Sequence, residues 1–398
     1  MANTHSETTP TVMESLRRHP LMWKPNASTL EYITTVSAAE DAEIGSALDS
    51  FKTHGLDGDA ITKENFPLPT LQAKLDQVCE EVHHGIGFAV VRGVGKNVGT
   101  NVHTAEDALL VFLGVAAYLG DVRGVQDRQG SVITHITSAK TWTVPPNLRH
   151  GIHTNQPLQW HNDCGSEILS LHVRGVAKNG GSTFVASGWT IFSELMLVYP
   201  SVVEILQRPT WPVQISGSPP RHILMPLVTV SSGKIFFAVD PGRLGLHPAA
   251  AVAGVDSGIP ELTHEQRQAL DILSAFATKN RLKLDVEAGD MVFVNNFALL
   301  HARDAYVDPD SDEGQPRHLV RLWIRNSSLS WPVPESMKAP WEAAWGPKGD
   351  GNPTTTKAGR QVVIEKTYAV SPSPEYKKSK YSAGSAAWVL EDSEDVDA

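Results

Sequence analysis

Apolar residues in the first third of the chain recur mostly at helical spacing. Helices are predicted over about 38–53, 69–84 and 104–119. The second of these has a single apolar stripe, formed by Leu71, Leu75, Val78 and Val82. Residues 85–94 are almost continuously apolar and are bracketed by glycines, which predicts a buried strand between the second and third helices.

From about residue 131 to residue 330 the pattern changes to short segments separated by turn residues. These segments predict strands at Ser131–Ile136, Gln159–Asp163, Ser170–Arg174, Ser182–Ala186, Lys234–Val239, Asp290–Asn295 and His318–Arg325. Helical patterns interrupt them at Trp189–Tyr199 and at Thr263–Lys279, where Thr263 is the expected cap. Many short strands with turns between them are typical of an antiparallel barrel or jelly roll, so we expect a mostly β fold with flanking helices.

The same pattern divides the chain into three parts. Residues 1–84 are expected to form an N-terminal arm and helices that pack on the barrel, and residues 85–332 are expected to form the barrel domain. Residues 333–398 are expected to form a C-terminal extension with a disordered tail, because five of the last eight residues are acidic.

Composition narrows the class of function. The chain has 398 residues, of which 41% are hydrophobic, and its formal net charge is −10. Nucleic-acid-binding proteins usually carry a basic face, so we expect no nucleic-acid partner. No apolar run reaches the length of a membrane span, and the N-terminus lacks the pattern of a secretory signal. With two cysteines and no CxxC pair, we expect a cytoplasmic protein without disulfides and without a membrane partner.

His161, Asp163 and His301 are the candidate metal ligands. His161 and Asp163 are two residues apart, so on the predicted strand their side chains point to the same face. His301 must then come from a strand that is folded back against the first. Two imidazoles and one carboxylate on one face of an octahedral ion leave three positions open, which is the ligand set of non-haem Fe(II) oxygenases.

A second group of polar residues suits an organic acid. Arg317 and Arg321 are four residues apart, so on a strand they share a face, and the guanidinium fork of arginine matches a carboxylate. Thr183, which follows a Gly-Gly turn, offers a hydroxyl group to the same carboxylate. Beside a metal, such groups can hold the far carboxylate of a dicarboxylic acid.

Three other residues are candidates for smaller roles. Arg303, two residues after His301, is expected to form a structural salt bridge. Asn296 is a candidate to brace the metal ligands by hydrogen bonding. His135, on a predicted strand, is a candidate to face the cavity.

In their order and spacing, these motifs resemble the taurine dioxygenase-like (TauD/TfdA) family of Fe(II)/2-oxoglutarate-dependent dioxygenases. The resemblance covers roughly residues 85–326 and rests on His161-x-Asp163, Gly180-Gly181-Ser182-Thr183, Gly289-Asp290 with Asn295-Asn296, His301-Ala302-Arg303 and Arg317-x-x-x-Arg321. Residues 118–126 also resemble the fungal clavaminate synthase-like branch. The resemblance implies a double-stranded β-helix, that is, a clavaminate synthase-like jelly roll, with Fe(II) bound by His161, Asp163 and His301.

The resemblance also implies a cosubstrate site and a reaction. Thr183 and Arg321 would bind the C5 carboxylate of 2-oxoglutarate, and Arg317 would lie near the metal-side end of the cosubstrate or assist the substrate. The reaction would consume O2 and convert 2-oxoglutarate to succinate and CO2 while a small-molecule substrate is oxidised. Because Asp163 fills the position that a halide would need, hydroxylation, desaturation or cyclisation is favoured over halogenation.

A non-oxidative metal-dependent hydrolase or isomerase on a cupin-like barrel is the alternative function. Such an enzyme needs no anchor for a dicarboxylic acid, so the presence of Thr183, Arg317 and Arg321 favours the dioxygenase. The sequence leaves open the identity of the primary substrate and whether the chain forms a homo-oligomer.

Overall fold

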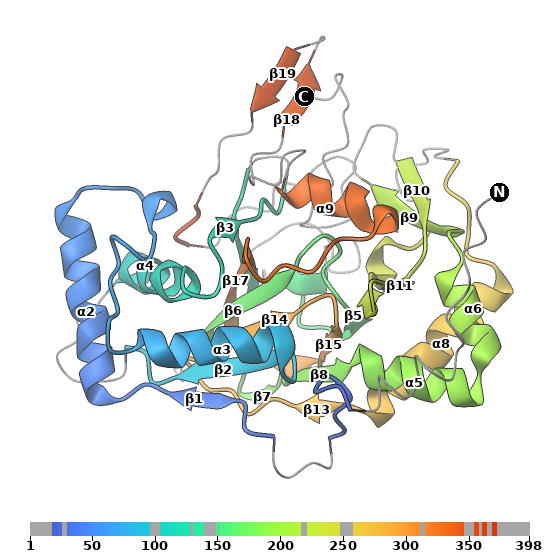
Figure 1. Cartoon of the computed structure of the whole chain (residues 1–398), viewed down its shortest axis with the longest axis horizontal. Coiled ribbons are helices and arrows are strands. Elements are labelled where there is room, and N and C mark those ends of the chain that lie inside the picture. The colour runs from blue at the N-terminus through green and yellow to red at the C-terminus, as the bar shows by residue number, and fades with distance from the viewer. Residues whose placement is uncertain are drawn as a thin grey trace.

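The computed structural model describes most of the chain between residues 18 and 371 (Figure 1). The described residues are 18–25, 30–95, 104–127, 130–138, 149, 151–215, 221–246, 258–310, 315–345, 354–357, 360–363 and 368–371. The first 17 residues of the expected N-terminal arm and the acidic C-terminal tail lie outside these ranges.

The larger of two facing sheets has seven strands. In spatial order they are β1 (Ile33–Thr35), β2 (Phe88–Arg92), β14 (Met291–Asn295), β6 (Ile168–Gly175), β17 (His318–Arg325) and β3 (Val122–Arg123), with β4 (Ile133–Thr137) paired to β17. All of these pairs are antiparallel except β1 with β2. The strands that are central in this sheet are therefore far apart in the sequence, as a jelly roll requires.

The smaller sheet has four strands and carries most of the candidate ligands. Its strands are β13 (Leu282–Lys283), β8 (Thr183–Ser187), β15 (Leu299–Arg303) and β5 (Leu158–His161). Four two-stranded pairs complete the β structure of the described residues: β9 (Trp211–Ile215) with β10 (Arg221–Met225), β11 (Val228–Ser231) with β12 (Lys234–Phe237), β7 (Asn179–Gly180) with β16 (Tyr306–Val307), and β18 (Thr354–Lys357) with β19 (Arg360–Val363).

Strands of the larger sheet are buried on both faces. In β14, Val292 and Val294 belong to the core between the two sheets, whereas Met291 and Phe293 belong to the core under the N-terminal helices. This double burial explains why the strand sequence is apolar throughout rather than alternating. One face of the sheet is thereby left for the site, and the other is covered by helices.

Helices flank both ends of the sheet arrangement (Figure 1). They are α2 (Ala38–Thr53), α3 (Gln72–His84), α4 (Ala105–Ala116), α5 (Gly188–Val198), α6 (Pro200–Gln207), α8 (His264–Lys279) and α9 (Lys338–Trp345), with 3-10 turns η1 (Gly58–Ala60), η3 (Gly151–His153), η4 (Pro241–Arg243) and η5 (Glu335–Met337). Helix α3 contacts β2 and β14, while α5, α6 and α8 contact one another. The expected helices are all present, and Thr263 caps α8 as predicted, in a capping box with Gln266.

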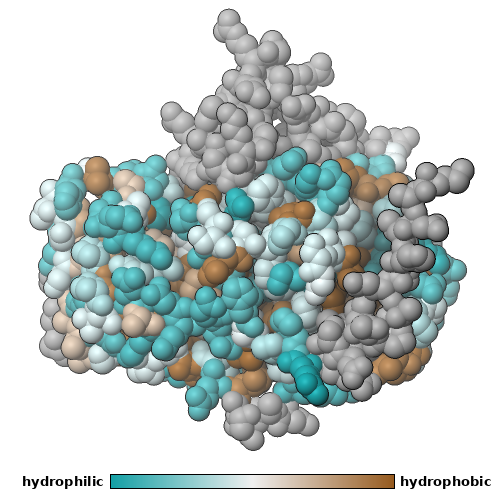
Figure 2. Space-filling view, in the orientation of Figure 1, coloured by the Kyte–Doolittle hydropathy of each residue, from teal (hydrophilic) through white to brown (hydrophobic). Residues whose placement is uncertain are grey.

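The face of the molecule in Figure 2 is mainly hydrophilic, with apolar residues in small groups between the polar ones. Among the described residues, the helices are too short or too polar to cross a membrane.

Candidate metal and cosubstrate site

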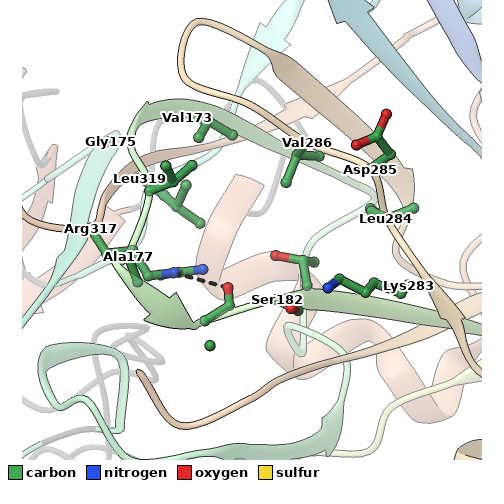
Figure 3. A pocket seen from close by; sticks show the side chains of 14 residues that line it. Val173, Gly175, Ala177, Ser182, Lys283, Leu284, Asp285, Val286, Arg317 and Leu319 are labelled. Carbon is green, nitrogen blue, oxygen red and sulfur yellow. Dashed lines mark hydrogen bonds between the residues drawn. The ribbon is translucent and has the colours of Figure 1, made fainter. Parts of the chain in front are cut away.

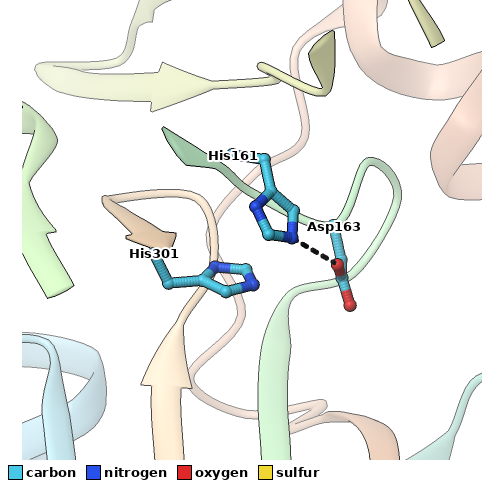
Figure 4. Close-up of side chains that lie close together, drawn as sticks. All are labelled: His161, Asp163 and His301. Carbon is cyan, nitrogen blue, oxygen red and sulfur yellow. Dashed lines mark ion pairs between the residues drawn. The ribbon is translucent and has the colours of Figure 1, made fainter. Parts of the chain in front are cut away.

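The three predicted metal ligands converge at one end of the cavity between the sheets (Figure 4). His161 and His301 are direct register partners on the antiparallel pair β5 and β15, and their ring centroids are 4.1 Å apart. The Nε2 atom of His161 lies 3.9 Å from Oδ1 of Asp163. One donor atom from each of the three residues lies within 4.8 Å of the other two, as two imidazoles and a carboxylate around one ion require.

Asp163 departs from the expected local structure, because β5 ends at His161 and Asp163 lies beyond it. The reason is Asn162, whose buried amide takes backbone partners that a continuing strand would use. Its Nδ2 donates to Phe237 O (2.5 Å) and Asn296 O (2.8 Å), and its Oδ1 accepts from Val239 N (2.5 Å). The prediction that both side chains point to one face of a strand is wrong, although the two donors still meet.

Asn296 holds the backbone of Asp163 in this turn. Its Oδ1 accepts from Asp163 N at 2.9 Å, and its Nδ2 donates to Asp163 O at 2.6 Å and to Ser166 O at 2.9 Å. Both partners are buried, so these hydrogen bonds are shielded from water. Asn296 thus fixes the position of the carboxylate without touching it.

The Asp163 carboxylate is kept ionised by its neighbours. Burial alone would raise its pKa, but Arg321 NH1 at 3.0 Å and the Trp323 Nε1–H at 2.9 Å, together with the two histidines, lower the pKa below its usual range. Arg321 is itself oriented by Gln126, whose Oε1 accepts from Arg321 Nε at 2.7 Å. Sequence reasoning missed Gln126 and Trp323, since neither lies in a recognisable metal-ligand spacing.

A hydrogen bond orients His161, and burial sets the protonation state of His301. His161 Nδ1 donates to Gln159 O at 2.7 Å, so Nε2 is the ring nitrogen that faces the other ligands. Burial lowers the pKa of His301 to about 3, which keeps the ring neutral at physiological pH. The donor set therefore fits a ferrous ion.

One cavity joins the metal ligands to the predicted cosubstrate residues. Its lining includes His161, Asp163, His301, Thr183, Arg317 and Arg321. The two arginines differ in position: Arg321 contacts Asp163, whereas Arg317 NH1 has no hydrogen-bond partner in the described part of the chain and its Nε donates to Gly181 O at 3.1 Å. Arg321, rather than Arg317, is thus the arginine at the metal end.

A second cavity of about 440 Å³ adjoins the first beyond Arg317 (Figure 3). Thr183, Arg317 and Leu319 line both cavities, so these three residues form the partition between them. The Arg317 side chain points into the space shown in Figure 3 and reaches across to the Gly181 backbone.

His135 does not face the metal cavity, contrary to the hypothesis from the sequence. Its neighbour Ile136 lines that cavity, while His135 lies on the other face of β4. There its Nδ1 is 2.8 Å from His318 Nε2, and its Nε2 donates to Ala369 O at 2.7 Å. The strand is one residue out of phase with the prediction, so the inward and outward positions are exchanged.

Comparison with known proteins gives the family. The sequence model of the family described as "Taurine catabolism dioxygenase TauD, TfdA family" matches residues 52–323. The taurine hydroxylase-like protein SAT17 of Stachybotrys chartarum is 32% identical over 317 residues, which cover 77% of this chain and 78% of that protein. The FR-33289 synthase of Streptomyces rubellomurinus is 27% identical over 324 residues, with 79% and 89% covered.

Solved structures of iron oxygenases share the fold. Asparagine oxygenase, in complex with Fe(II), hydroxyasparagine and succinate, superposes with a TM-score of 0.55 at 17% identity, covering 74% of this chain and 93% of its own. The non-haem iron oxygenase OrfP superposes with a TM-score of 0.52 at 18% identity, covering 75% and 94%. The fold is therefore the clavaminate synthase-like double-stranded β-helix. Together with the His161, Asp163 and His301 site, the family match makes this chain a member of the TauD/TfdA family of Fe(II)- and 2-oxoglutarate-dependent dioxygenases.

Proposed function

We propose that this dioxygenase binds 2-oxoglutarate along the cavity, with its keto-acid end at the three metal donors and its far carboxylate at Thr183 and Arg317. The observation that carries the proposal is that all five residues line one cavity. Arg317 is only 4% exposed, its NH1 is buried without a hydrogen-bond partner, and its guanidinium forms no salt bridge with the described residues. A carboxylate is the ligand that its planar fork fits best.

Arg321 then acts at the metal end of the cosubstrate site. The family resemblance implies that Arg321 binds the far carboxylate, but its NH1 is 3.0 Å from Asp163 and it is 4% exposed. In this position its charge keeps Asp163 ionised for the metal, and it lies beside the keto-acid end of the bound cosubstrate. Arg317 and Arg321 therefore exchange the roles expected for them.

The residues of the site would hold Fe(II) through His161 Nε2, a carboxylate oxygen of Asp163 and His301. When bound, the ion activates O2 at the expense of 2-oxoglutarate, which becomes succinate and CO2, so that a C–H bond of the substrate can be oxidised. Trp323 and Asn296 keep Asp163 in place, and Ile152, Leu158 and Leu171 line the cavity with apolar surface that excludes water.

The substrate is a small organic molecule, and we assign it to the polar acids, such as a sulfonate or an amino acid. The support is the naming of two similar proteins, a taurine hydroxylase-like protein and an asparagine oxygenase. The reaction is a hydroxylation, a desaturation or a cyclisation. A net charge of −10 argues against nucleic-acid partners, and the cytoplasm is the compartment we propose.

Succinate release tests the proposal. Purified protein is incubated with Fe(II), ascorbate, 2-oxoglutarate and O2, with and without a panel of small sulfonates and amino acids. We expect slow succinate formation from uncoupled turnover and faster formation with the true substrate. Absence of succinate with every compound and at every iron concentration would contradict the proposed reaction.

A further inference from the structure

A second buried arginine lies at the far end of the cavity. Arg303 is on β15, two residues after His301, and is the direct cross-strand partner of Thr183 on β8. Side chains of such partners project from the same face of a sheet and start about 5 Å apart. Arg303 is 5% exposed and lines the same cavity as Thr183 and Arg317.

Part of the Arg303 guanidinium already has a structural task. Its NH2 donates to the carbonyl oxygens of Gly151 at 3.4 Å and Thr154 at 2.9 Å, and to that of Gln156. These contacts hold the loop that contains η3 against the cavity. The salt bridge expected from the sequence is absent, because no carboxylate within the described ranges pairs with Arg303.

The rest of the guanidinium has no partner. Nε and NH1 of Arg303 are buried and make no hydrogen bond to any described residue, and the same holds for NH1 of Arg317. Both guanidinium carbons lie over the buried ring of Tyr306, at 5.0 Å for Arg303 and 5.3 Å for Arg317. The nearby acid, Asp308, accepts from the backbone N–H of Arg317 at 2.8 Å. Two cations thus share one ring, with three N–H-bearing nitrogens left to donate.

This arrangement is unfavourable until an anion binds. A buried donor without an acceptor loses its hydration without compensation, and two like charges in a region of low dielectric repel each other. A single carboxylate relieves both costs, because its two oxygens offer about four acceptor positions. Two guanidinium groups and the Thr183 hydroxyl can therefore bind to one carboxylate.

We propose that Arg303 is a further binding residue for the far carboxylate of the cosubstrate, which it grips together with Thr183 and Arg317. This inference rests on the proposed placement of 2-oxoglutarate in the cavity. Its consequence is that selection for a dicarboxylic keto acid depends on two arginines, Arg303 at the end of β15 in the smaller sheet and Arg317 directly before β17 of the larger sheet.

The test measures preference for the far carboxylate rather than turnover. Protein loaded with Mn(II) in the absence of O2 is titrated by calorimetry with 2-oxoglutarate and with 2-oxopentanoate, which has the same keto-acid end and a methyl group in place of the far carboxylate. The Kd for 2-oxopentanoate divided by the Kd for 2-oxoglutarate is a ratio that reports on contacts to that carboxylate alone. In Arg303→Gln we expect this ratio to fall by about 10- to 100-fold, as for loss of a charge-assisted hydrogen bond.

A purely structural role predicts a different result. If Arg303 only holds the loop at residues 151–156, the substitution weakens both ligands by the same factor and leaves the ratio unchanged, which would overturn the inference. The matched control is Arg123→Gln, because Arg123 is also buried and donates to three carbonyls of one loop, those of Gly58, Asp59 and Ile61. Its ratio should equal that of the wild type.

Two further measurements keep the outcomes separate. Where Arg303→Gln fails to fold, Arg303→Lys keeps the charge and loses the fork, and we expect a smaller fall in the ratio; an unchanged ratio counts against the inference. Where the wild-type protein itself binds the two keto acids equally, the placement of the far carboxylate is wrong, and the inference falls with it. If the wild type prefers 2-oxoglutarate but the ratio is unchanged in the Arg303 variant, only the role of Arg303 is excluded and the placement of the far carboxylate stands.

Discussion

At the metal end of the cavity the charged side chains pair with one another, whereas at the far end two buried arginines form no salt bridge with the described residues. Asp163 is bound by Arg321 and Trp323, and Arg321 is bound in turn by Gln126. At the far end, Arg303 and Arg317 both keep buried N–H groups without an acceptor among the described residues.

The difference reflects what each end has to do. Metal ligands must already be oriented and in the correct protonation state when the ion arrives, so the protein supplies their partners. A cosubstrate that enters and leaves in every cycle must instead supply the missing partner itself, and unsatisfied donors make the empty site selective for it. Substitutions at the two ends should therefore have different signatures.

Removing the metal-end carboxylate should have the largest effect. In Asp163→Ala we expect succinate formation to be abolished, because one of the three metal donors is lost. Arg321 then loses the carboxylate with which it pairs, and breaking such a buried pair typically costs about 3–5 kcal/mol of stability. Succinate assays and chemical denaturation measure the two effects, and near-normal succinate in a folded variant would contradict the assignment of Asp163.

Substitution of Arg317, at the far end of the cavity, should weaken cosubstrate binding while leaving the metal site intact. In Arg317→Gln we expect the KM for 2-oxoglutarate to rise steeply, since loss of a buried charge pair costs about 2–5 kcal/mol. The paired variant, Arg321→Gln, should mainly reduce metal retention. If Arg321→Gln raises the KM more than Arg317→Gln does, the assignment of the two ends is reversed. Steady-state kinetics and Mn(II) titration distinguish these results.

A subtler change at the metal end sharpens the comparison. Asn296→Ala removes the acceptor of Asp163 N and the donor to two carbonyls, so Asp163 is less well positioned. We expect metal affinity to fall by about 10- to 100-fold, the usual effect of losing an outer-shell partner. Asn280→Ala is the control, because Asn280 is also buried but donates to Glu194 on α5 and to the Phe276 carbonyl on α8. Equal metal affinities in the two variants would argue against a positioning role.

On the face of the larger sheet that packs against α4, His172 affects stability in a way that depends on pH and not on the metal or cosubstrate. Burial, with Arg174 as a smaller contributor, lowers the pKa of His172 to about 3. The unfolded chain binds this proton from about pH 6.5 downward and the folded chain only near pH 3, so the group reduces stability as the pH falls between these values.

His172→Gln should remove this loss. Between about pH 7.5 and pH 5, the variant should lose about 2 kcal/mol less unfolding free energy than the wild type. Urea denaturation at the two pH values measures the difference. An identical pH dependence in both proteins would show that His172 takes up no proton on unfolding. The variants of Asp163, Arg317 and Arg321 should keep the wild-type pH dependence of unfolding between these two pH values.

The sequence was sufficient for the parts of the site that depend on regular periodicity and spacing. The meeting of His161 and His301 followed from the need for a strand folded back on the first, and register pairing of β5 with β15 confirms it. The helix starting at Thr263 followed from its capping pattern. Both are local or two-strand properties.

Other features depend on contacts that no spacing reveals. Asp163 lies beyond its strand because the Asn162 side chain bonds to backbone groups far away in the sequence. The interval between Arg317 and Arg321 predicts a common face but not which of them lies nearer the metal. That depends on where β17 passes Asp163, and it emerges only when the two sheets are assembled.

The direct pairing of His161 with His301 also makes the metal a test of correct strand alignment. A shift of β15 by one residue would place Leu300 or Ala302 opposite His161 in place of His301, and neither of these side chains can bind a metal. Only the correctly aligned antiparallel pair of β5 and β15 can bind the ion through both histidines. The bound ion therefore adds its binding free energy to that alignment and to no shifted one. Iron that is available while the chain folds would then favour the native pairing of these two strands, although His161 and His301 are about 140 residues apart in the sequence.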